Sequence, residues 1–417
     1  MQLKAQINVL LFIAVLLNSS LVTSGDNDLT KSITLDYENR LKAIFEDFHA
    51  HPELSLAEFE TARKISAALK NHGFKVTENV GGTGVVALLE NGKGPLVMMR
   101  ADMDGLPLEE KTDLPYASKD KQLDPVTGNI FPVMHACGHD VHITALIGTA
   151  KQMVDLKSEW SGTLMLIAQP AEERVLGARN MMNDNLWERF GKPDYALAFH
   201  VSSMLPSGIV NVVDGSPYAG ADTVDIYVHG IGAHGASPHA GKDPIVLGSQ
   251  IVNSLQTLVS RELPPRQPGV VTVGAFHSGT KHNIISDMAH LQLTVRNTND
   301  KTRDTLLSGI KRISENLGRA AGLPEDKLPE VVISEESTPP TINDTELANR
   351  LKNLWQEKMG IDRVTSYSSD GMGAEDFPFF TREPHIPSVY FAIGGTNHEY
   401  FKAALDGSGP PIPSHHS

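Results

Sequence analysis

Residues 95–105, PLVMMRADMDG, form an apolar run that ends in two aspartates, Asp102 and Asp104. The run is short and almost entirely apolar, which predicts a buried strand over 95–102. Further short apolar runs alternate with helical patterns: strands are predicted at 162–170, 194–201 and 386–394, and helices at 36–50, 56–72, 141–156 and 344–358. Alternating strands and helices are typical of an α/β domain with a central, mostly parallel sheet.

The middle of the chain has a different pattern. Its predicted elements are, in order, a strand at 223–230, a helix at 243–261, strands at 270–276 and 290–296, a helix at 300–320 and a strand at 329–335. This β-α-β-β-α-β order is that of a compact split module. We therefore predict a catalytic domain in two parts, 36–215 and 339–417, with an inserted domain at 216–338.

Length and charge limit the alternatives. The chain has 417 residues, which is too long for one ordinary core and favours about two domains. It has 36 Lys and Arg against 50 Asp and Glu, a formal net charge of −14, and no basic run. Nucleic acid and anionic membrane surfaces are therefore not expected as partners, because both require clustered positive charge.

The N-terminal residues have the pattern of a secretory signal. Lys4 precedes an apolar run at 8–17, and small residues follow up to Gly25. The apolar run is too short to span a bilayer. We predict a signal peptide at 1–25 and an exported mature protein in a periplasm, outside the cell or in a secretory lumen, without a membrane partner once the signal is removed. An uncleaved signal anchor is the alternative.

The single cysteine, Cys137, lies in MHACGHDVH at 134–142 and has no partner for an intramolecular disulfide. Residues with metal-binding or acid–base chemistry also follow the predicted strands. The candidates at this edge of the sheet are Cys137, His139, Glu172, Glu173 and His200. Because sites in open α/β sheets form at the carboxyl ends of strands, these side chains are expected to converge. A thiolate with imidazoles and carboxylates suits one or two ions of Zn, Mn, Co or Ni.

The neighbouring carboxylates of Glu172 and Glu173 can have different roles, since one can bind metal while the other acts as general base for water. In the inserted domain, His234 lies in a glycine-rich loop and can stabilise an oxyanion. Arg296 can bind a carboxylate through two hydrogen bonds, and Asn283 lies in the same module. Each candidate also has a purely structural alternative: a small buried cysteine, a core histidine, a solvated acidic turn or a surface arginine.

Eight stretches occur in a fixed order along the chain: FHAHPELSLAEFET, MRADMDGLPLEE, HACGHDVH, QPAEER, AFHV, GAHGASPHAGKDP, NIISDMAHLQLTVR and GMGAEDFPFF. Together they resemble the metal-dependent aminoacylase/carboxypeptidase amidohydrolases. The branch with hippurate hydrolases, N-acyl-L-amino-acid amidohydrolases and the indole-acetyl-amino-acid hydrolases of plants is the most similar. The resemblance implies a dimetal α/β catalytic domain with an inserted lid or dimerisation domain.

The resemblance also implies a role for each candidate. The implied ligands of two divalent ions are Cys137, His139, Glu173, His200 and the late histidine His416, with His415 as a poorer match. Glu172 is the implied general base, and His234 the residue that assists the tetrahedral intermediate. Asn283 and Arg296 match positions near the substrate carboxylate, and Asp104 matches a carboxylate behind the ligands. The family continues by about one helix beyond the late histidine, so either this fold does without that helix or the chain is truncated after Ser417.

We therefore expect a metal-dependent amidohydrolase that cleaves the amide bond of a small N-acyl amino acid, and a homodimer through the inserted domain. A metallo-carboxypeptidase or dipeptidase is one alternative. A thiol enzyme, with Cys137 as nucleophile and His135 or His139 as base, is another. The third is a binding protein that has the fold without the chemistry.

Overall fold

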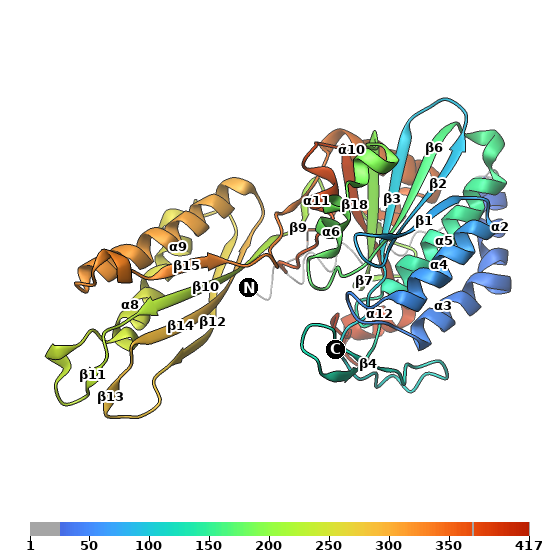
Figure 1. Cartoon of the computed structure of the whole chain (residues 1–417). Helices are drawn as coiled ribbons and strands as arrows, with labels where there is room; N and C mark the ends of the chain where they lie inside the picture. Colours follow the sequence, from blue (N-terminus) through green and yellow to red (C-terminus); the bar gives the residue numbers. More distant parts are fainter. Residues whose placement is uncertain (1–25, 369–370, 417) are drawn as a thin grey trace. The chain divides into compact units, whose positions relative to one another are not determined.

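The computed structural model describes residues 26–368 and 371–416 (Figure 1). The chain divides into two compact units. Unit 1 comprises Met1–Pro217, Asn343–Ser368 and Phe380–Ser417, and unit 2 comprises Tyr218–Ile342 and Ser369–Phe379. The insertion expected at 216–338 did not include the second, later segment of unit 2. The signal peptide predicted at 1–25 lies outside the described residues.

Unit 1 is built on an eight-stranded sheet. Its strands are, in spatial order, β1 (Lys75–Val80), β2 (Gly84–Asn91), β6 (Gly162–Gln169), β3 (Leu96–Asp102), β7 (Tyr195–Pro206), β18 (Ser388–Thr396), β8 (Val210–Asn211) and β17 (Val364–Thr365). The four central strands β6, β3, β7 and β18 are parallel to one another. The fold class expected from the alternating pattern is confirmed, but β1 and β2 form an antiparallel edge that the pattern did not indicate.

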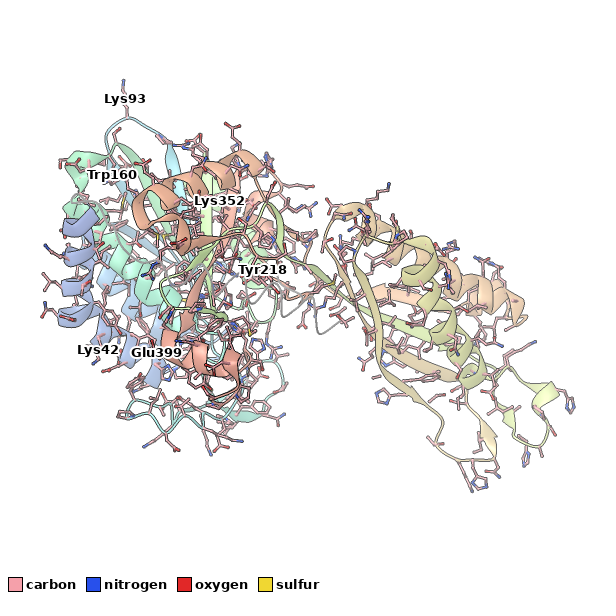
Figure 2. All side chains as sticks on the ribbon, turned by 180° about the vertical axis from the view of Figure 1, so that it is seen from behind. Lys42, Lys93, Trp160, Tyr218, Lys352 and Glu399 are labelled. Atoms are coloured by element: carbon pink, nitrogen blue, oxygen red, sulfur yellow. The ribbon has the colours of Figure 1, made fainter. Side chains whose placement is uncertain are left out.

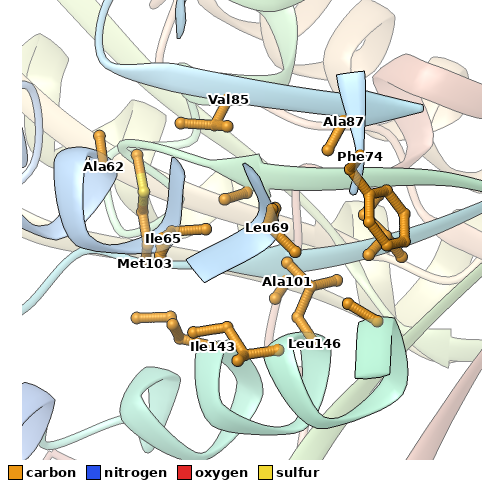
Figure 3. Close-up of a cluster of buried hydrophobic side chains, with 14 of the residues drawn as sticks. Ala62, Ile65, Leu69, Phe74, Val85, Ala87, Ala101, Met103, Ile143 and Leu146 are labelled. Atoms are coloured by element: carbon orange, nitrogen blue, oxygen red, sulfur yellow. The ribbon is translucent and has the colours of Figure 1, made fainter. Parts of the chain in front are cut away.

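Helices cover both faces of this sheet. On one face α3 (Lys42–Ala50), α4 (Phe59–Asn71) and α5 (His139–Asp155) bury an apolar cluster against β2, β3 and β6, in which Leu69 and Leu146 are fully buried (Figure 3). On the other face α10 (Thr345–Met359) packs Leu347 and Ala348 against Val389 of β18. Removing apolar surface from water stabilises the folded state by about 25 cal/mol per Å², so such clusters make the main stabilising contribution.

The remaining elements before and after unit 2 are short. They are α2 (Asp26–Asp36), a π-helical turn at Tyr37–Leu41, β4 (Lys121–Leu123), β5 (Ile130–Pro132), α6 (Gly177–Asn183), α7 (Leu186–Phe190), β9 (Gly215–Tyr218), β16 (Thr341–Asn343), α11 (Pro378–Thr381) and α12 (His398–Asp406). Figure 2 shows Lys93, on the turn before β3, projecting from one end of the sheet. The carboxyl ends of the parallel strands therefore lie at the opposite end.

Unit 2 is a four-stranded antiparallel sheet covered by two helices. Its elements are β10 (Gly220–His229), β11 (Ala233–His234), α8 (Pro244–Thr257), a π-helical turn at Leu258–Glu262, β12 (Gly269–Ser278), β13 (Ile284–Ile285), β14 (Met288–Asn297), α9 (Asp300–Ala320) and β15 (Glu330–Ile333). Apart from the short β11 and β13, the order is the predicted β-α-β-β-α-β. Asp243 caps α8 by accepting hydrogen bonds from the backbone N–H groups of Ile245 and Val246.

The chain segments that enter and leave unit 2 lie side by side within it. Ala221 and Thr338 exchange two backbone hydrogen bonds, of 2.9 and 2.8 Å. The backbone N–H of Ala219 donates to the carbonyl oxygen of Gly373 at 2.8 Å. Unit 2 also has an apolar core of its own, which includes Ile226 and Leu291. It therefore has the anatomy of an inserted domain whose ends meet.

Candidate metal centre

Three adjacent parallel strands bring the predicted residues of unit 1 together. Asp102 ends β3 and Asp104 follows it, while Glu172 and Glu173 follow β6, and His200 lies on β7. The order β6-β3-β7 in the sheet places these groups next to one another. The N-terminus of α5, which packs on β3, supplies two more candidates, Cys137 and His139.

Cys137 lies between two histidines that are distant in the sequence. Its Sγ is 3.3 Å from Nε2 of His200 and 3.2 Å from Nε2 of His416. The next residue, Gly138, has φ of +85°, and a Cβ there would come 2.4 Å from Cγ1 of Val201. Only glycine therefore fits between Cys137 and the strand that carries His200.

The carboxylates complete the cluster around His139. Its Nε2 lies 3.8 Å from Oε2 of Glu172 and 3.9 Å from Oε1 of Glu173. Oε1 of Glu173 is also 3.6 Å from Nε2 of His416. Three overlapping groups have one potential ligand atom from each member within 4.8 Å: Cys137, His139 and His200; Cys137, Glu173 and His416; His139, Glu172 and Glu173.

The outer hydrogen bonds turn ligand lone pairs toward this cluster. Nδ1 of His139 lies 2.8 Å from the carbonyl oxygen of Asp104, and Nδ1 of His200 lies 2.6 Å from that of Val201. Both Nδ1 atoms must therefore donate, which leaves both Nε2 atoms as acceptors or ligands. Oδ2 of Asp104 accepts from Oγ of Ser55 at 2.7 Å and from the backbone N–H of Glu173 at 3.1 Å.

The buried atoms at the centre fit a divalent cation. Among the described residues, neither Nε2 of His139 nor Oε1 of Glu173 has a hydrogen-bond partner, although both atoms are buried. Buried polar atoms are normally paired. A soft thiolate, imidazole nitrogens and carboxylate oxygens within one small volume form a typical donor set for Zn, Mn, Co or Ni. The residues therefore fit the metal that the sequence implied.

The electrostatics agree with this interpretation. Burial raises the pKa of the Cys137 thiol to about 12 and that of Glu173 to about 7. Burial and the neighbouring His142 lower the pKa of His200 well below its usual value. In His139, burial acts to lower the pKa, but Asp102 and Asp104 outweigh it and raise that pKa. A bound cation would favour the thiolate, the carboxylate and the neutral imidazoles together.

A buried network behind the centre was not anticipated from the sequence. The Arg100 guanidinium, fully buried, donates to Oδ2 of Asp102 at 2.6 Å. Nδ1 of His142 lies 2.5 Å from Oδ1 of Asp102, and its Nε2 accepts from the backbone N–H of Val201 at 2.9 Å. Both ring nitrogens of His142 are thus engaged, so it is poorly placed to bind metal. The missed signal was a charged residue, Arg100, inside an apolar strand, since a buried charge requires partners.

The two late histidines occupy different positions. Nε2 of His415 accepts a hydrogen bond of 3.3 Å from the backbone N–H of Ser203, whereas Nε2 of His416 faces Cys137 and Glu173. The backbone N–H of His416 donates to the carbonyl oxygen of Ala136 at 3.3 Å. His416 is therefore the histidine that the geometry brings to the cluster.

The other three candidates lie in unit 2, and not together. His234 lies on β11, and the backbone N–H of Gly235 donates to the carbonyl oxygen of Asn283 at 2.8 Å. Arg296 lies near the far end of β14, which begins at Met288. Eight strand residues at about 3.3 Å each separate Met288 from Arg296 by roughly 26 Å. One small substrate cannot therefore contact Asn283 and Arg296 of the same chain.

Arg296 is half-buried and lies opposite Ala221, where the chain enters unit 2. Burial lowers the pKa of its guanidinium. It donates to Oγ1 of Thr294 at 3.1 Å and to the carbonyl oxygen of Met372 at 3.4 Å, and it forms no ion pair with any described residue. The guanidinium can therefore still bind an anionic partner.

No helix among the described residues is long and apolar enough to cross a membrane.

Comparison with known proteins places this geometry in a family. The model of peptidase family M20/M25/M40 matches residues 98–405. A hippurate hydrolase from Campylobacter jejuni is 35% identical over 347 residues, which cover 83% of this chain and 86% of that protein. Thermostable carboxypeptidase 1 from Saccharolobus solfataricus is 35% identical over 371 residues, with 88% of each chain covered.

Solved structures agree with the sequence comparison. A methicillin-resistant Staphylococcus aureus protein described as an aminohydrolase has a TM-score of 0.82 and 31% identity, and covers 94% of this chain and 93% of its own. The YXEP protein of Bacillus subtilis, described as a dinuclear metal-binding peptidase, has a TM-score of 0.70 and 29% identity, with 86% and 89% covered. Family, fold and the cluster at Cys137 thus agree, and the chain belongs to peptidase family M20/M25/M40.

Proposed function

We propose that the chain hydrolyses the amide bond between an acyl group and the nitrogen of a free amino acid. The family is one of hydrolases of amide and peptide bonds. Two relatives, a hippurate hydrolase and an N-acetyl-L-cysteine deacetylase, have names that describe the hydrolysis of such conjugates. The observation that carries the proposal is the position of Glu172. Oε2 of Glu172 is 3.8 Å from Nε2 of His139, whereas Oε1 of Glu173 lies 3.9 Å from Nε2 of His139 and 3.6 Å from Nε2 of His416, so Glu173 is the better placed of the two as a ligand and Glu172 is assigned to the proton transfer.

We assign Cys137, His139, Glu173, His200 and His416 to hold two divalent ions, with Asp104 supporting His139 and Glu173 from behind. Mn, Zn, Co and Ni all suit this donor set. The metal, when bound, polarises the substrate carbonyl and lowers the pKa of water. Asp104 orients two of the ligands, so it contributes through them and not by contact with the substrate.

Glu172 is the proton carrier in this proposal. Its carboxylate takes a proton from the attacking water, and the water oxygen forms the new bond to the carbonyl carbon. The C–N bond then breaks, and Glu172 returns the proton to the leaving amine nitrogen, so that atoms and charges balance. Its position beside His139, 8% exposed, keeps bulk water away from this transfer.

The residues of unit 2 are proposed to act on the substrate. The backbone N–H of Ala236 donates to Nδ1 of His234 at 3.0 Å, which leaves Nε2 of this exposed histidine free to donate to an oxyanion. Arg296 is proposed to bind the substrate carboxylate. Asn283 lies beside His234. Because one small substrate cannot contact both this end of unit 2 and Arg296 of the same chain, we propose that His234 and Asn283 of one copy act on a substrate that Arg296 of a second copy binds.

A homodimer through unit 2 is part of the proposal. β12 is an edge strand of the four-stranded sheet, and Phe276 on it and Val246 on α8 are exposed apolar residues. An open strand edge with apolar neighbours favours pairing with a second copy. Sedimentation of Val246→Glu against wild type tests the proposed dimer, and a monomeric wild type at micromolar concentration would refute it.

Export through the signal at 1–25 likewise stays a proposal, and N-terminal sequencing of the mature protein tests it.

The second candidate is a carboxypeptidase, because a relative with that name is 35% identical over 88% of this chain. A panel of N-acyl amino acids and of short peptides, offered to metal-reconstituted protein, separates the two by the ratio of kcat/KM. Preference for peptides with a free C-terminal residue would replace the first proposal.

Two further alternatives differ in their controls. A thiol enzyme based on Cys137 would survive removal of metal by a chelator, although the raised pKa of this thiol disfavours such a nucleophile. A binding protein without chemistry would hydrolyse no member of the panel. Loss of activity on chelation and its return with metal would exclude both.

A further inference from the structure

The loop that carries Glu172 and Glu173 is a tight turn closed on Ala171. The carbonyl oxygen of Ala171 accepts from the backbone N–H groups of Leu176 and Gly177, at 3.2 and 3.1 Å. Ala171 has φ of +48°, in the left-handed region that a residue with a Cβ adopts at a cost. Something outside the turn must therefore hold this residue in place.

The external contact is the carboxylate of Glu58. Its Oε1 accepts from the backbone N–H of Ala171 at 2.8 Å and from that of Leu56 at 3.0 Å. Its Oε2 accepts from Oγ1 of Thr83 at 2.6 Å. Leu56 also has positive φ, +69°, and Glu58 is 0% exposed. One buried carboxylate thus binds the N–H groups of two residues in the left-handed region.

Helix capping does not explain this burial. Glu58 occupies the N-cap position of α4, but its side chain makes no capping hydrogen bond. That role belongs to Glu53, whose carboxylate accepts from the backbone N–H groups of Glu60 at 3.2 Å and Thr61 at 2.7 Å. A buried carboxylate is costly unless it is hydrogen-bonded. Its partners show that Glu58 supports the turn at Ala171 and not the start of the helix.

The same segment supports the turn at a second point. Oγ of Ser55 donates to Oδ2 of Asp104 at 2.7 Å, and that oxygen also accepts from the backbone N–H of Glu173 at 3.1 Å. The backbone on both sides of Glu172 is therefore hydrogen-bonded to a buried carboxylate, at Ala171 by Glu58 and at Glu173 by Asp104.

We propose that Glu58 is a positioning residue: by holding the backbone N–H of Ala171 it fixes the direction in which Glu172 projects, while Asp104 holds the neighbouring Glu173. The kinetic part of this inference rests on the proposed function, in which Glu172 moves the proton. Without Glu58 the turn gains freedom at its left-handed residue, and the carboxylate of Glu172 spends less time in its productive position. Displacement by about 1 Å can lower a rate by roughly 100-fold.

The first test needs no activity. Hydrogen exchange in peptides covering residues 170–177 is measured on metal-free wild type, Glu58→Ala and Glu53→Ala. Both variants lose a glutamate from one segment, but only Glu58 contacts the turn. We expect exchange of this segment to rise by about tenfold or more in Glu58→Ala and to stay near wild type in Glu53→Ala. Equal exchange in the two variants would overturn the proposal.

The second test measures kcat and KM separately in the metal-loaded protein. We expect Glu58→Ala to lower kcat by roughly tenfold or more, with KM and metal content near wild type. Glu58→Gln keeps an oxygen acceptor for both N–H groups and an amide donor for Thr83, so it should recover most of kcat. A Gln variant as slow as the Ala variant would overturn the proposal. If Glu58→Ala does not fold, Glu58→Asp takes its place in this comparison, because its shorter side chain displaces the carboxylate from the backbone N–H of Ala171. If wild type hydrolyses nothing in the panel, the proposed function fails, while the exchange experiment still decides the role of Glu58.

Discussion

Nε2 of His416 lies 3.2 Å from Sγ of Cys137, a residue 279 positions earlier in the chain. The hydrogen bond from the backbone N–H of His416 to Ala136 holds the segment against the loop of Cys137. The side chain of His416 is half exposed, so this contact is at the accessible side of the cluster. The donor set is therefore complete only when the late segment is seated on the loop.

The two adjacent late histidines give the first prediction. His416→Ala should reduce the bound metal from two ions per chain toward one, because His416 faces Cys137 and Glu173. His415→Ala is the matched control, since His415 contacts the backbone of Ser203 instead. Elemental analysis of dialysed protein measures both. Equal metal content in the two variants would show that His416 is not a ligand.

Glu172→Gln should retain metal and lose turnover. General acid–base catalysis contributes roughly 100- to 10,000-fold, so kcat should fall within that range. Glu173→Gln should instead weaken metal binding, because Oε1 of Glu173 lies at the centre of the cluster. Metal titrations and kcat, measured on both variants, check the division of roles. Full turnover by Glu172→Gln would remove this residue from the mechanism.

Metal affinity should increase with pH. Burial raises the pKa of the Cys137 thiol to about 12 and that of Glu173 to about 7 in the metal-free chain. Metal binds the deprotonated forms, so binding releases protons. Calorimetry in two buffers with different ionisation enthalpies, at about pH 6 and about pH 8, measures this release directly. Binding without proton release at the lower pH would contradict the assignment of these two ligands.

The same shift affects stability before metal is added. Because the folded-state pKa of Glu173, about 7, is above the ordinary value of 4.5 for a glutamate, the folded chain binds more protons than the unfolded chain between these values. This contribution to stability is complete below about pH 4.5 and is lost as the pH rises through about 7. Metal-free wild type should therefore lose more stability over this range than Glu173→Gln. Identical pH profiles would contradict the raised pKa.

The role of Gly138 in the loop of Cys137 can be tested with Gly128 as the control position. Both have positive φ, but a Cβ at Gly138 would clash with Val201, whereas nothing lies within 4 Å of one at Gly128. Gly138→Ala should displace Cys137 and lower metal affinity by at least about tenfold. Gly128→Ala should lower stability by about 1 kcal/mol through backbone strain alone. Titration with metal and thermal unfolding separate the two effects.

A buried ion pair within unit 2 gives a prediction that is independent of the site. Asp222 is fully buried, and Arg303 donates to its two oxygens at distances from 2.6 to 3.1 Å. Asp222→Ala leaves a partly buried guanidinium without its partner and should cost about 3 kcal/mol of unfolding free energy. Glu262→Ala breaks an exposed pair with Arg312 and should cost less than about 1 kcal/mol. Denaturant unfolding of both variants checks the contrast.

Much of the fold follows from local patterns. The helix predicted at 243–261 begins where the structure has it, since α8 begins at Pro244 with Asp243 as its cap. Apolar runs located the central strands to within a few residues. The antiparallel β1 and β2 and the helix α12 were not predicted, because their patterns are short and their stability comes from the sheet on which they pack.

The candidate site divides in the same way. Residues with unusual chemistry at strand ends, such as Cys137 and Glu173, could be proposed from the sequence, and the structure brings them together. The partners that hold them could not, because contacts such as Glu58 with Ala171, 113 positions apart, depend on tertiary packing. The sequence also grouped Asn283 with Arg296, although strand length separates them.

The pairing of Ala221 with Thr338 bears on how such a chain can accommodate a second domain. Since the entry and exit strands are hydrogen-bonded neighbours, the domain around them closes almost no additional loop, and the entropic cost of the insertion is small. A module with adjacent ends and its own core can be exchanged or lengthened during evolution without refolding its host. Under the proposed function, in which unit 2 contacts the substrate, substrate preference then changes by substitution within this module, while the strands that carry the candidate metal ligands stay as they are.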